Sequence, residues 1–285
     1  MRLVTIVDNM SGFTCQSRLV HRLETPEKHF IAEQGFSLLV ETDAGQKVVI
    51  DAGGSEYAFT NNLRNAGLEP KDVNACIVTH GHYDHVGGLM PLIEAGVPIY
   101  THPKTFVGRR YSTYGEIKTD ISAPTKIIES LGKTQLHFVS SLTEVLPGVR
   151  ISGEVPRATD FEAPVNFLRE EESKVFEDSV VDEQAIYLTC RKGLVVVAGC
   201  AHQGIVNIVT HAKKATGSRI YMVLGGFHLA NATAERIRKT MDQLKNLGVD
   251  RIAPMHCTGF EAMKMISDRF VGFELMPAGS EIDFI

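Results

Sequence analysis

Four side chains that could bind a metal ion lie within six residues of one another: His80, His82, Asp84 and His85. They belong to the segment 79–88 (THGHYDHVGG), whose glycines allow the backbone to approach a neighbour closely. This segment follows residues 75–79 (ACIVT), an apolar run typical of a buried strand. Imidazole and carboxylate groups suit Zn²⁺, Fe or Mn, and their position at a strand end would present them together in a cleft.

The spacing of these four residues indicates two metal ions. In extended backbone, His80 and His82 are two positions apart and point to the same side. Asp84 and His85 come after the chain turns, where they could reach a second ion. Two-metal sites hold their ions about 3.5–4 Å apart. We therefore expect two divalent cations, with Zn²⁺ as the first choice and Fe, Mn or Mg as alternatives.

Three further histidines also follow predicted strands. His202, His228 and His256 lie in the segments GCAH, GGFHL and PMHC. Because strand ends in alternating strand–helix units meet at one edge of a sheet, we expect these histidines to share a site with residues 80–85. The other histidines have no ligand partner at a useful spacing and are expected to be surface or packed residues: His21, His29, His102, His137 and His211.

Strands and helices alternate around these motifs. Strands are predicted at 3–8, 36–42, 47–51, 75–79 and 98–101, with helices ending at Ala66 and covering 86–95. In the last third of the chain, strands at 194–198, 220–224 and 251–254 are each followed by a helix, at 205–216, 233–247 and 260–269.

Other segments carry weaker patterns. Thr258 and Glu261 fit a capping box for the last helix. Residues 9–34 lack periodicity and favour a functional flap. Residues 103–133 are rich in basic side chains, whereas the acidic stretch 153–183 reads as a loop or surface insertion. No linker is evident, so we expect one domain over 1–285.

Composition excludes several classes of protein. Of the 285 residues, 44% are hydrophobic and 22% are charged, which is typical of a globular domain and excludes disorder. The net charge of −5 argues against nucleic acid as a partner. No apolar run reaches the roughly 18 residues of a membrane span, so we expect no membrane partner and a cytoplasmic location. Five cysteines without a C-x-x-C pair disfavour disulfides or a zinc ribbon, and nothing indicates the oligomeric state, which leaves a homo-oligomer open.

The segment 79–88 matches the H-x-H-x-D-H signature of the metallo-β-lactamase superfamily, and the chain resembles that superfamily over essentially its whole length. Residues 49–53 (VIDAG) resemble its first motif, and His256 resembles its last histidine. The resemblance implies an α/β (α+β) fold, an αββα sandwich of two mixed sheets flanked by helices, with the site at one edge between the sheets. The segments 153–162, 199–207, 224–229 and 254–259 are similar to a branch labelled dihydropteroate-synthase-like, which includes archaeal pterin synthases of methanopterin biosynthesis.

The resemblance also suggests roles for individual residues. In many members of the family a Gly-His-Thr motif supplies one further ligand. Here His202 is the best candidate for that ligand, with Cys200 or Glu154 as alternatives. If Cys200 is not a ligand, we expect it to contact the ligands. Asp51 is expected to accept a hydrogen bond from a ligating imidazole. For His228, ligation, proton transfer and substrate contact stay open. The implied metal ligands are His80, His82, Asp84, His85, His202 and His256, with Asp84 and His228 as the catalytic residues.

Two cysteines are expected to play no part in the site. Cys257 follows His256 directly and should point away from it, while Cys76 lies inside a predicted strand and should belong to the core.

Three functions fit these residues. The first is a transferase that joins an aromatic amine to a pterin methylene carbon and expels diphosphate, and hence acts on small phosphorylated substrates. Arg109 and Arg110, or Arg18 and Arg22, would then meet the phosphate groups. The second is hydrolysis of a phosphoester, lactone, thioester or amide by a metal-bound hydroxide that Asp84 orients. The third is a metal-binding regulatory protein without turnover.

Overall fold

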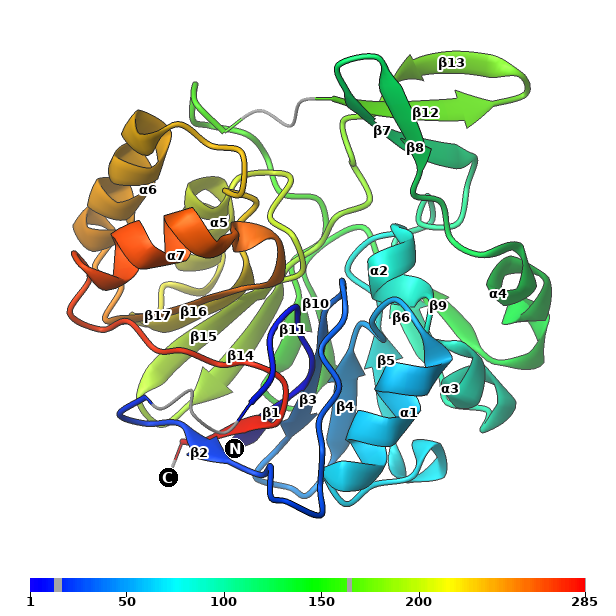
Figure 1. Ribbon diagram of the computed structural model, residues 1–285, viewed down its shortest axis with the longest axis horizontal. Helices are drawn as coiled ribbons and strands as arrows, with labels where there is room; N and C mark the ends of the chain where they lie inside the picture. The colour runs from blue at the N-terminus through cyan, green and yellow to red at the C-terminus, as the bar shows by residue number, and fades with distance from the viewer. Residues whose placement is uncertain (13–16, 163–165, 285) are drawn as a thin grey trace.

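The computed structural model describes residues 1–12, 17–162 and 166–284, which form three sheets (Figure 1). The first has eight strands in the order β2 (His21–Arg22), β18 (Ser280–Asp283), β1 (Arg2–Val7), β3 (Ser37–Glu41), β4 (Lys47–Ile50), β5 (Ala75–Ile77), β6 (Ile99–Thr101) and β9 (Leu136–Phe138). The second has six strands in the order β10 (Thr143–Leu146), β11 (Val149–Ile151), β14 (Ile186–Cys190), β15 (Gly193–Ala198), β16 (Ile220–Gly226) and β17 (Arg251–Met255). Both sheets contain parallel and antiparallel pairs.

Alternating side chains explain why these two sheets pack face to face. In β15, Val195 and Val197 join β3 and β4 residues in the core between the sheets, whereas Leu194 and Val196 pack under helices on the outer side. In β3, Leu39 likewise faces outward, against helices of the other layer. Buried strands with apolar residues on both faces require such cover on both sides. The layers are therefore helix, sheet, sheet and helix, and the αββα fold predicted from the resemblance is confirmed.

The helices divide between the two outer faces (Figure 1). One face of the molecule carries α1 (Glu56–Asn65), α3 (Met90–Glu94) and α4 (Thr125–Ser130), near the short α2 (Tyr83–Val86). The other carries α5 (Ile205–Thr216), α6 (Ala234–Asn246) and α7 (Phe260–Ser267). Short 3₁₀ turns lie at η1 (Pro70–Asp72), η2 (Leu131–Lys133) and η3 (His256–Thr258). No helix in the described part of the chain has the length and apolar character that crossing a bilayer requires.

The predicted helix over 86–95 is wrong, because the chain forms two short helices there. α2 ends at Val86, and Gly87 and Gly88 then pass within contact of neighbouring backbone. A Cβ atom at Gly87 or Gly88 would lie 2.1 Å from the carbonyl oxygen of Gly54 or Ala52. This close packing holds α2, which carries two of the predicted ligands, against the end of β4.

Two other expectations are also corrected. Thr258 does not cap α7, whose N-cap is Gly259; its hydroxyl accepts a hydrogen bond from the Phe227 N–H instead. The acidic stretch contains β12 (Phe167–Glu171) and β13 (Lys174–Glu177), which pair with β7 (Arg109–Tyr114) and β8 (Ile117–Asp120) in a third sheet of four strands. This sheet projects beyond the sandwich, at the top of Figure 1. Charged, half-exposed strands of this kind lack the apolar alternation on which the sequence analysis relied.

Candidate metal centre

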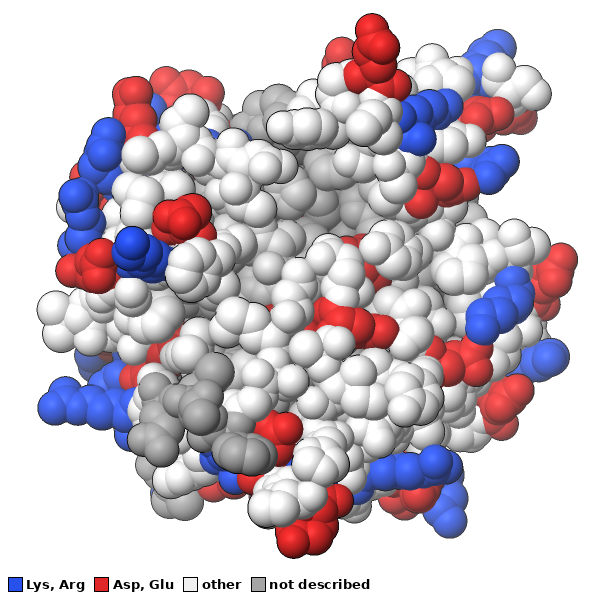
Figure 2. All heavy atoms as spheres, in the orientation of Figure 1, with Lys and Arg blue, Asp and Glu red and all other residues white. Residues whose placement is uncertain are grey.

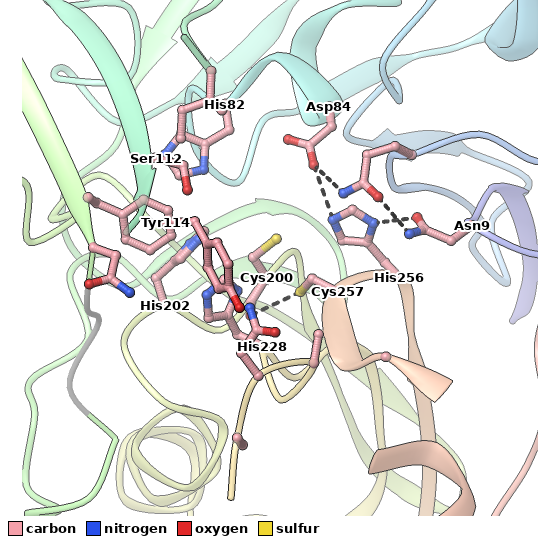
Figure 3. Close-up of a pocket in the computed structure, with 18 of the residues that line it drawn as sticks. Asn9, His82, Asp84, Ser112, Tyr114, Cys200, His202, His228, His256 and Cys257 are labelled. Carbon is pink, nitrogen blue, oxygen red and sulfur yellow. Dashed lines mark hydrogen bonds and ion pairs between the residues drawn. The ribbon is translucent and has the colours of Figure 1, made fainter. Parts of the chain in front are cut away.

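Four of the predicted ligands line a cavity of about 460 Å³ at the ends of the central strands, and the other two, His80 and His85, are fully buried behind them. His82 and Asp84 follow β5 of the first sheet, while His202, His228 and His256 follow β15, β16 and β17 of the second. Figure 2 shows the hollow in this face of the molecule, and Figure 3 shows the labelled side chains pointing toward one another. The site therefore lies where the two sheets meet at one edge.

One set of side chains, the first ligand group, consists of His80, His82 and His202. Nε2 of His80 lies 3.1 Å from Nδ1 of His82, and the ring centroids of His82 and His202 are 4.9 Å apart. The ring centroids of His80 and His202 are 4.8 Å apart. All three side chains are buried.

The second ligand group consists of Asp84, His85 and His256. Oδ2 of Asp84 lies 3.5 Å from Nε2 of His256, and Oδ1 lies 4.0 Å from Nε2 of His85. The rings of His85 and His256 face each other edge to face, with centroids 5.1 Å apart. The structure thus brings His256 to Asp84 and His85, the two residues that the spacing assigned to a second ion.

Cys200 lies between the two groups. Its Sγ is 3.2 Å from Nε2 of His85. The ligand atoms of Cys200, His80 and His202 lie within 4.8 Å of one another, and so do those of Cys200, His85 and His256. The structure thus places Cys200 among the ligand atoms themselves, where it would add a thiolate to either group of ligands.

The buried polar atoms fit a pair of divalent cations. Nε2 of His82 and Nε2 of His256 are buried without a hydrogen-bond partner. Such atoms cost free energy unless something satisfies them, and a metal ion would do so. The donor set of imidazole, carboxylate and thiolate is the one that Zn²⁺ prefers.

Hydrogen bonds fix the orientation of three of the imidazoles. Asp51 accepts from His85 at 2.7 Å and also binds the Thr79 hydroxyl at 2.6 Å. Glu183 lies 2.9 Å from Nδ1 of His202, and Asn9 lies 2.8 Å from Nδ1 of His256. Carboxylate or amide oxygens at one ring nitrogen leave the other nitrogen for the metal.

Backbone strain also concentrates at this site. Asp51, Ala201, His228 and His256 all have positive φ, between 47° and 56°, and each follows directly on a strand or its terminal turn. For residues with a Cβ this conformation costs on the order of 1–3 kcal/mol each. Strain of this kind persists at functional sites where the surroundings impose it, and two of these residues, His228 and His256, line the cavity.

The charge state of the ligands depends on burial and on their neighbours. Burial and the adjacent imidazoles hold the pKa of His80 and of His82 well below the ordinary value of 6.5, which keeps both rings neutral. Burial opposes protonation of His85 as well, but the Asp51 carboxylate outweighs it and raises the pKa of His85 to about 9. Burial raises the pKa of the Cys200 thiol. A divalent cation would favour neutral imidazole and thiolate in all four cases.

His228 and Cys257 form a pair on the floor of the cavity. Nδ1 of His228 is buried without a partner, and both side chains line the cavity. The ligand atoms of Cys200, His228 and Cys257 also lie within 4.8 Å of one another. The expectation that Cys257 points away from the site is therefore wrong, because η3 turns the chain directly after β17 and returns its side chain to the cavity.

Several other predicted residues lie away from the cavity. Glu154 has a side chain that is 54% exposed and contacts His102, so it is not the remaining ligand. Arg109 is exposed and paired with Asp120. Arg110 is buried, 2.8 Å from Asp182, and is not available to a substrate.

The two arginines of the predicted flap also lie outside the cavity lining. Arg22 is bound to Glu24, and Arg18 is exposed. Among the described residues of the flap, 9–12 and 17–34, Asn9 and Gln34 at its ends line the cavity.

Two carboxylates that no sequence pattern indicated, Asp182 and Glu183, form hydrogen bonds that hold the ligand-bearing segments in place. Asp182 accepts from the Gly81 N–H at 3.0 Å and binds Arg110, so the pair holds the loop that carries His80 and His82. Glu183 accepts from His202 and from the Gln203 N–H. Both lie at the end of the acidic stretch, where many similar residues surround them, and spacing alone does not distinguish them.

Comparison with known proteins agrees with this geometry. A family model described as the metallo-beta-lactamase superfamily matches residues 31–256. The chain belongs to the metallo-β-lactamase superfamily. Among its curated relatives is the 7,8-dihydropterin-6-methyl-4-(beta-D-ribofuranosyl)-aminobenzene-5'-phosphate synthase of Methanocaldococcus jannaschii, which is 32% identical over 90% of this chain and 91% of the relative.

Solved structures of the metallo-β-lactamase superfamily resemble the whole sandwich. Tm1679, described as a metal-dependent hydrolase of the beta-lactamase superfamily, superimposes with a TM-score of 0.82 at 29% identity, over 99% of this chain and 98% of that one. Zn²⁺-bound PqqB from Methylobacterium extorquens shares the fold, with a TM-score of 0.59 at 13% identity over 99% of this chain and 100% of that one. Within this superfamily the similar proteins thus carry both synthase and hydrolase names.

Proposed function

We propose that this chain is a metal-dependent transferase that condenses a hydroxymethyl-dihydropterin diphosphate with an arylamine ribosyl phosphate and releases diphosphate. The observation that carries this proposal is the 32% identity to a pterin-related synthase over 90% of the chain, with the ligand-type residues gathered in one cavity. Although the net charge is −5, bound divalent cations would make the cavity locally positive, which suits small anionic substrates.

The proposed reaction forms one bond and breaks one. The amine nitrogen donates its lone pair to the pterin methylene carbon, the bond from that carbon to the diphosphate oxygen breaks, and the nitrogen loses a proton. The two ligand groups and Cys200 would hold two divalent cations, which supply charge neutralisation for the leaving diphosphate when bound. The imidazole rings of the ligands are held in place by Asp51, Glu183 and Asn9 while negative charge develops on the leaving diphosphate.

His228 is placed to accept the proton. It lines the cavity, and its buried Nδ1 has no partner. A base must lie within hydrogen-bond reach of the proton that it removes, which a substrate amine in this cavity allows. Phe167 packs against His228, with ring centroids 5.7 Å apart, and limits the access of water to it.

The test is to incubate zinc-loaded protein with hydroxymethyl-dihydropterin diphosphate and the arylamine ribosyl phosphate and to measure diphosphate. We expect release that requires the amine, and loss of that release in His82→Ala but not in His137→Ala, an exposed histidine outside the cavity. Amine-independent release, or no release with metal bound, would overturn the transferase.

A hydrolase is the second candidate, favoured by the likeness of the whole chain to Tm1679. In that case Asp84, which lies beside both His85 and His256, would orient an attacking water. Phosphoesters, lactones and thioesters assayed with the same zinc-loaded protein separate the two functions, since a hydrolase needs no second substrate.

A further inference from the structure

Positive charge in the cavity comes from a residue that the sequence patterns did not indicate. Arg236 is the one lysine or arginine that lines the cavity within residues 1–12, 17–162 and 166–284. It lies in the first turn of α6, and the preceding residues Ala230, Asn231 and Ala232 line the same wall. The cavity thus pairs a cluster of metal-ligand side chains with a single permanent cation.

The guanidinium of Arg236 has no use within the fold that the structure shows. Among the residues that the structure describes, its buried Nε has no hydrogen-bond partner, and its backbone N–H donates to the hydroxyl of Thr233. The buried carboxylate nearby, Glu162, is already engaged by the N–H groups of Val206 and Asn207. Leaving a buried donor of a charged group unsatisfied costs free energy, which a bound anion would offset.

The arginines first considered for phosphate binding differ in this respect. Arg109, Arg110 and Arg22 are each paired with a carboxylate, from Asp120, Asp182 and Glu24. The N–H donors of a paired arginine are already engaged by a carboxylate. An arginine without such a partner can direct the donors of its planar guanidinium group to a phosphate group.

Arg236 also lies close to the chemistry of the cavity. His228 and Arg236 line the same cavity, together with Ala230, Asn231 and Ala232 of the segment that joins them. A substrate bound between the ligand groups and this wall would therefore have one end at His228 and the ligands, and the rest of its length toward Arg236.

From these observations we infer that Arg236 is a specificity-determining residue, which binds the terminal phosphate of the arylamine ribosyl phosphate while the ligand groups receive the diphosphate. This inference rests on the function proposed above for the identity of the substrate. The chemistry that it requires is more general: a phosphomonoester at the end of a substrate whose reacting atom lies at the metal centre. Two anions are then bound at separate places, so that neither competes with the other.

The test compares the binding of 4-(β-D-ribofuranosyl)aminobenzene 5′-phosphate and of its dephosphorylated form to zinc-loaded protein by calorimetry. Wild-type protein should prefer the phosphorylated compound by about 10- to 100-fold, as expected for charge-assisted hydrogen bonds. Arg236→Gln should abolish the preference, and Arg236→Lys should restore part of it. Arg238→Gln is the matched control, since Arg238 lies on the same helix but is exposed and outside the cavity lining.

A preference that survives in Arg236→Gln would overturn the inference, with bound zinc confirming that the variant is folded. Inorganic phosphate, titrated into wild-type protein and Arg236→Gln, separates this inference from the proposed function. Phosphate binding that Arg236→Gln weakens, without binding of either arylamine, would retain the anion site and reject the transferase. If neither phosphate nor the arylamines distinguish the two proteins, the anion site itself is rejected.

Discussion

At the scale of single residues, Cys200 is the side chain that lies close to both ligand groups. It contacts His85 directly and its sulfur belongs to both sets of ligand atoms. The sequence analysis kept it as an alternative to His202, yet the structure brings both into the cavity.

Replacing Cys200 with Ser should therefore weaken metal binding at both ions. We expect zinc content after dialysis to fall from about two ions per chain to one or fewer, because a hydroxyl is a far weaker ligand than a thiolate. Cobalt-loaded wild-type protein should show a thiolate charge-transfer absorption that the variant lacks. Cys190→Ser is the control, since that cysteine only donates to the Gly193 carbonyl oxygen in a turn. Two tightly held ions in Cys200→Ser would refute the role of Cys200 as a ligand.

At the scale of elements, the ends of the strands do the positioning. β5 and α2 carry one half of the ligands, and β15 to β17 carry the other. The loop from β5 to α2 is held by the buried Arg110 and Asp182, which come from β7 and from the segment before β14. Through Arg110, the third sheet thus supports the loop that carries His80 and His82, in addition to lining the cavity.

Replacing Arg110 with Met should destabilise the protein by about 3–5 kcal/mol, because it leaves the buried carboxyl group of Asp182 without its counter-ion. Arg109→Met, one residue earlier on the same strand, should change the free energy of unfolding by less than about 1 kcal/mol, since Arg109 is 65% exposed. Urea unfolding of the metal-free proteins measures both. Equal losses in the two variants would show that the buried pair has no special role.

At the scale of the whole molecule, bound ions would tie the two sheets together. The ligands come from both sheets, so an ion binds only when the sandwich is assembled. Such binding stabilises the folded state by roughly 2.7 kcal/mol at a free metal concentration of 100 Kd. Because one fold can host many different reactions, the reaction of this protein depends on the side chains of the cavity and not on the sandwich itself.

Metal-free protein should lose stability on either side of neutral pH. The pKa of His80 and of His82 lies below the unfolded value of 6.5, so the unfolded chain takes up more protons and stability falls as the pH drops below about 6.5. His85 has the opposite effect: its stabilisation is complete below 6.5 and is lost as the pH rises through about 9. Chelator-treated protein unfolded by urea across this range is the measurement. A flat profile would contradict the charge states described above.

Much of this protein was predictable because its signals are local. The helix at 233–247 and the buried strand before His80 depend on a few neighbouring residues, and both are found where the periodicity indicated. The helix over 86–95 was not predictable, because its interruption depends on the distant backbone of β4 and of the following turn. The strands of the acidic stretch, β12 and β13, were missed for a related reason, because β12 pairs with β7, which is distant in the sequence.

By itself, the sequence determined the set of histidines that follow strands, because these rest on short spacings and on alternation along the chain. Its motifs also showed the resemblance to the superfamily, and that resemblance implied the layered fold. Only the tertiary structure decided which side chains share the cavity. It brought Glu183, Asn9 and Cys257 to the ligands, buried Arg110 with Asp182, and left Arg236 as the cation at the cavity wall. Contacts between residues far apart in the chain arise from the packing of the two sheets, and no local pattern encodes them.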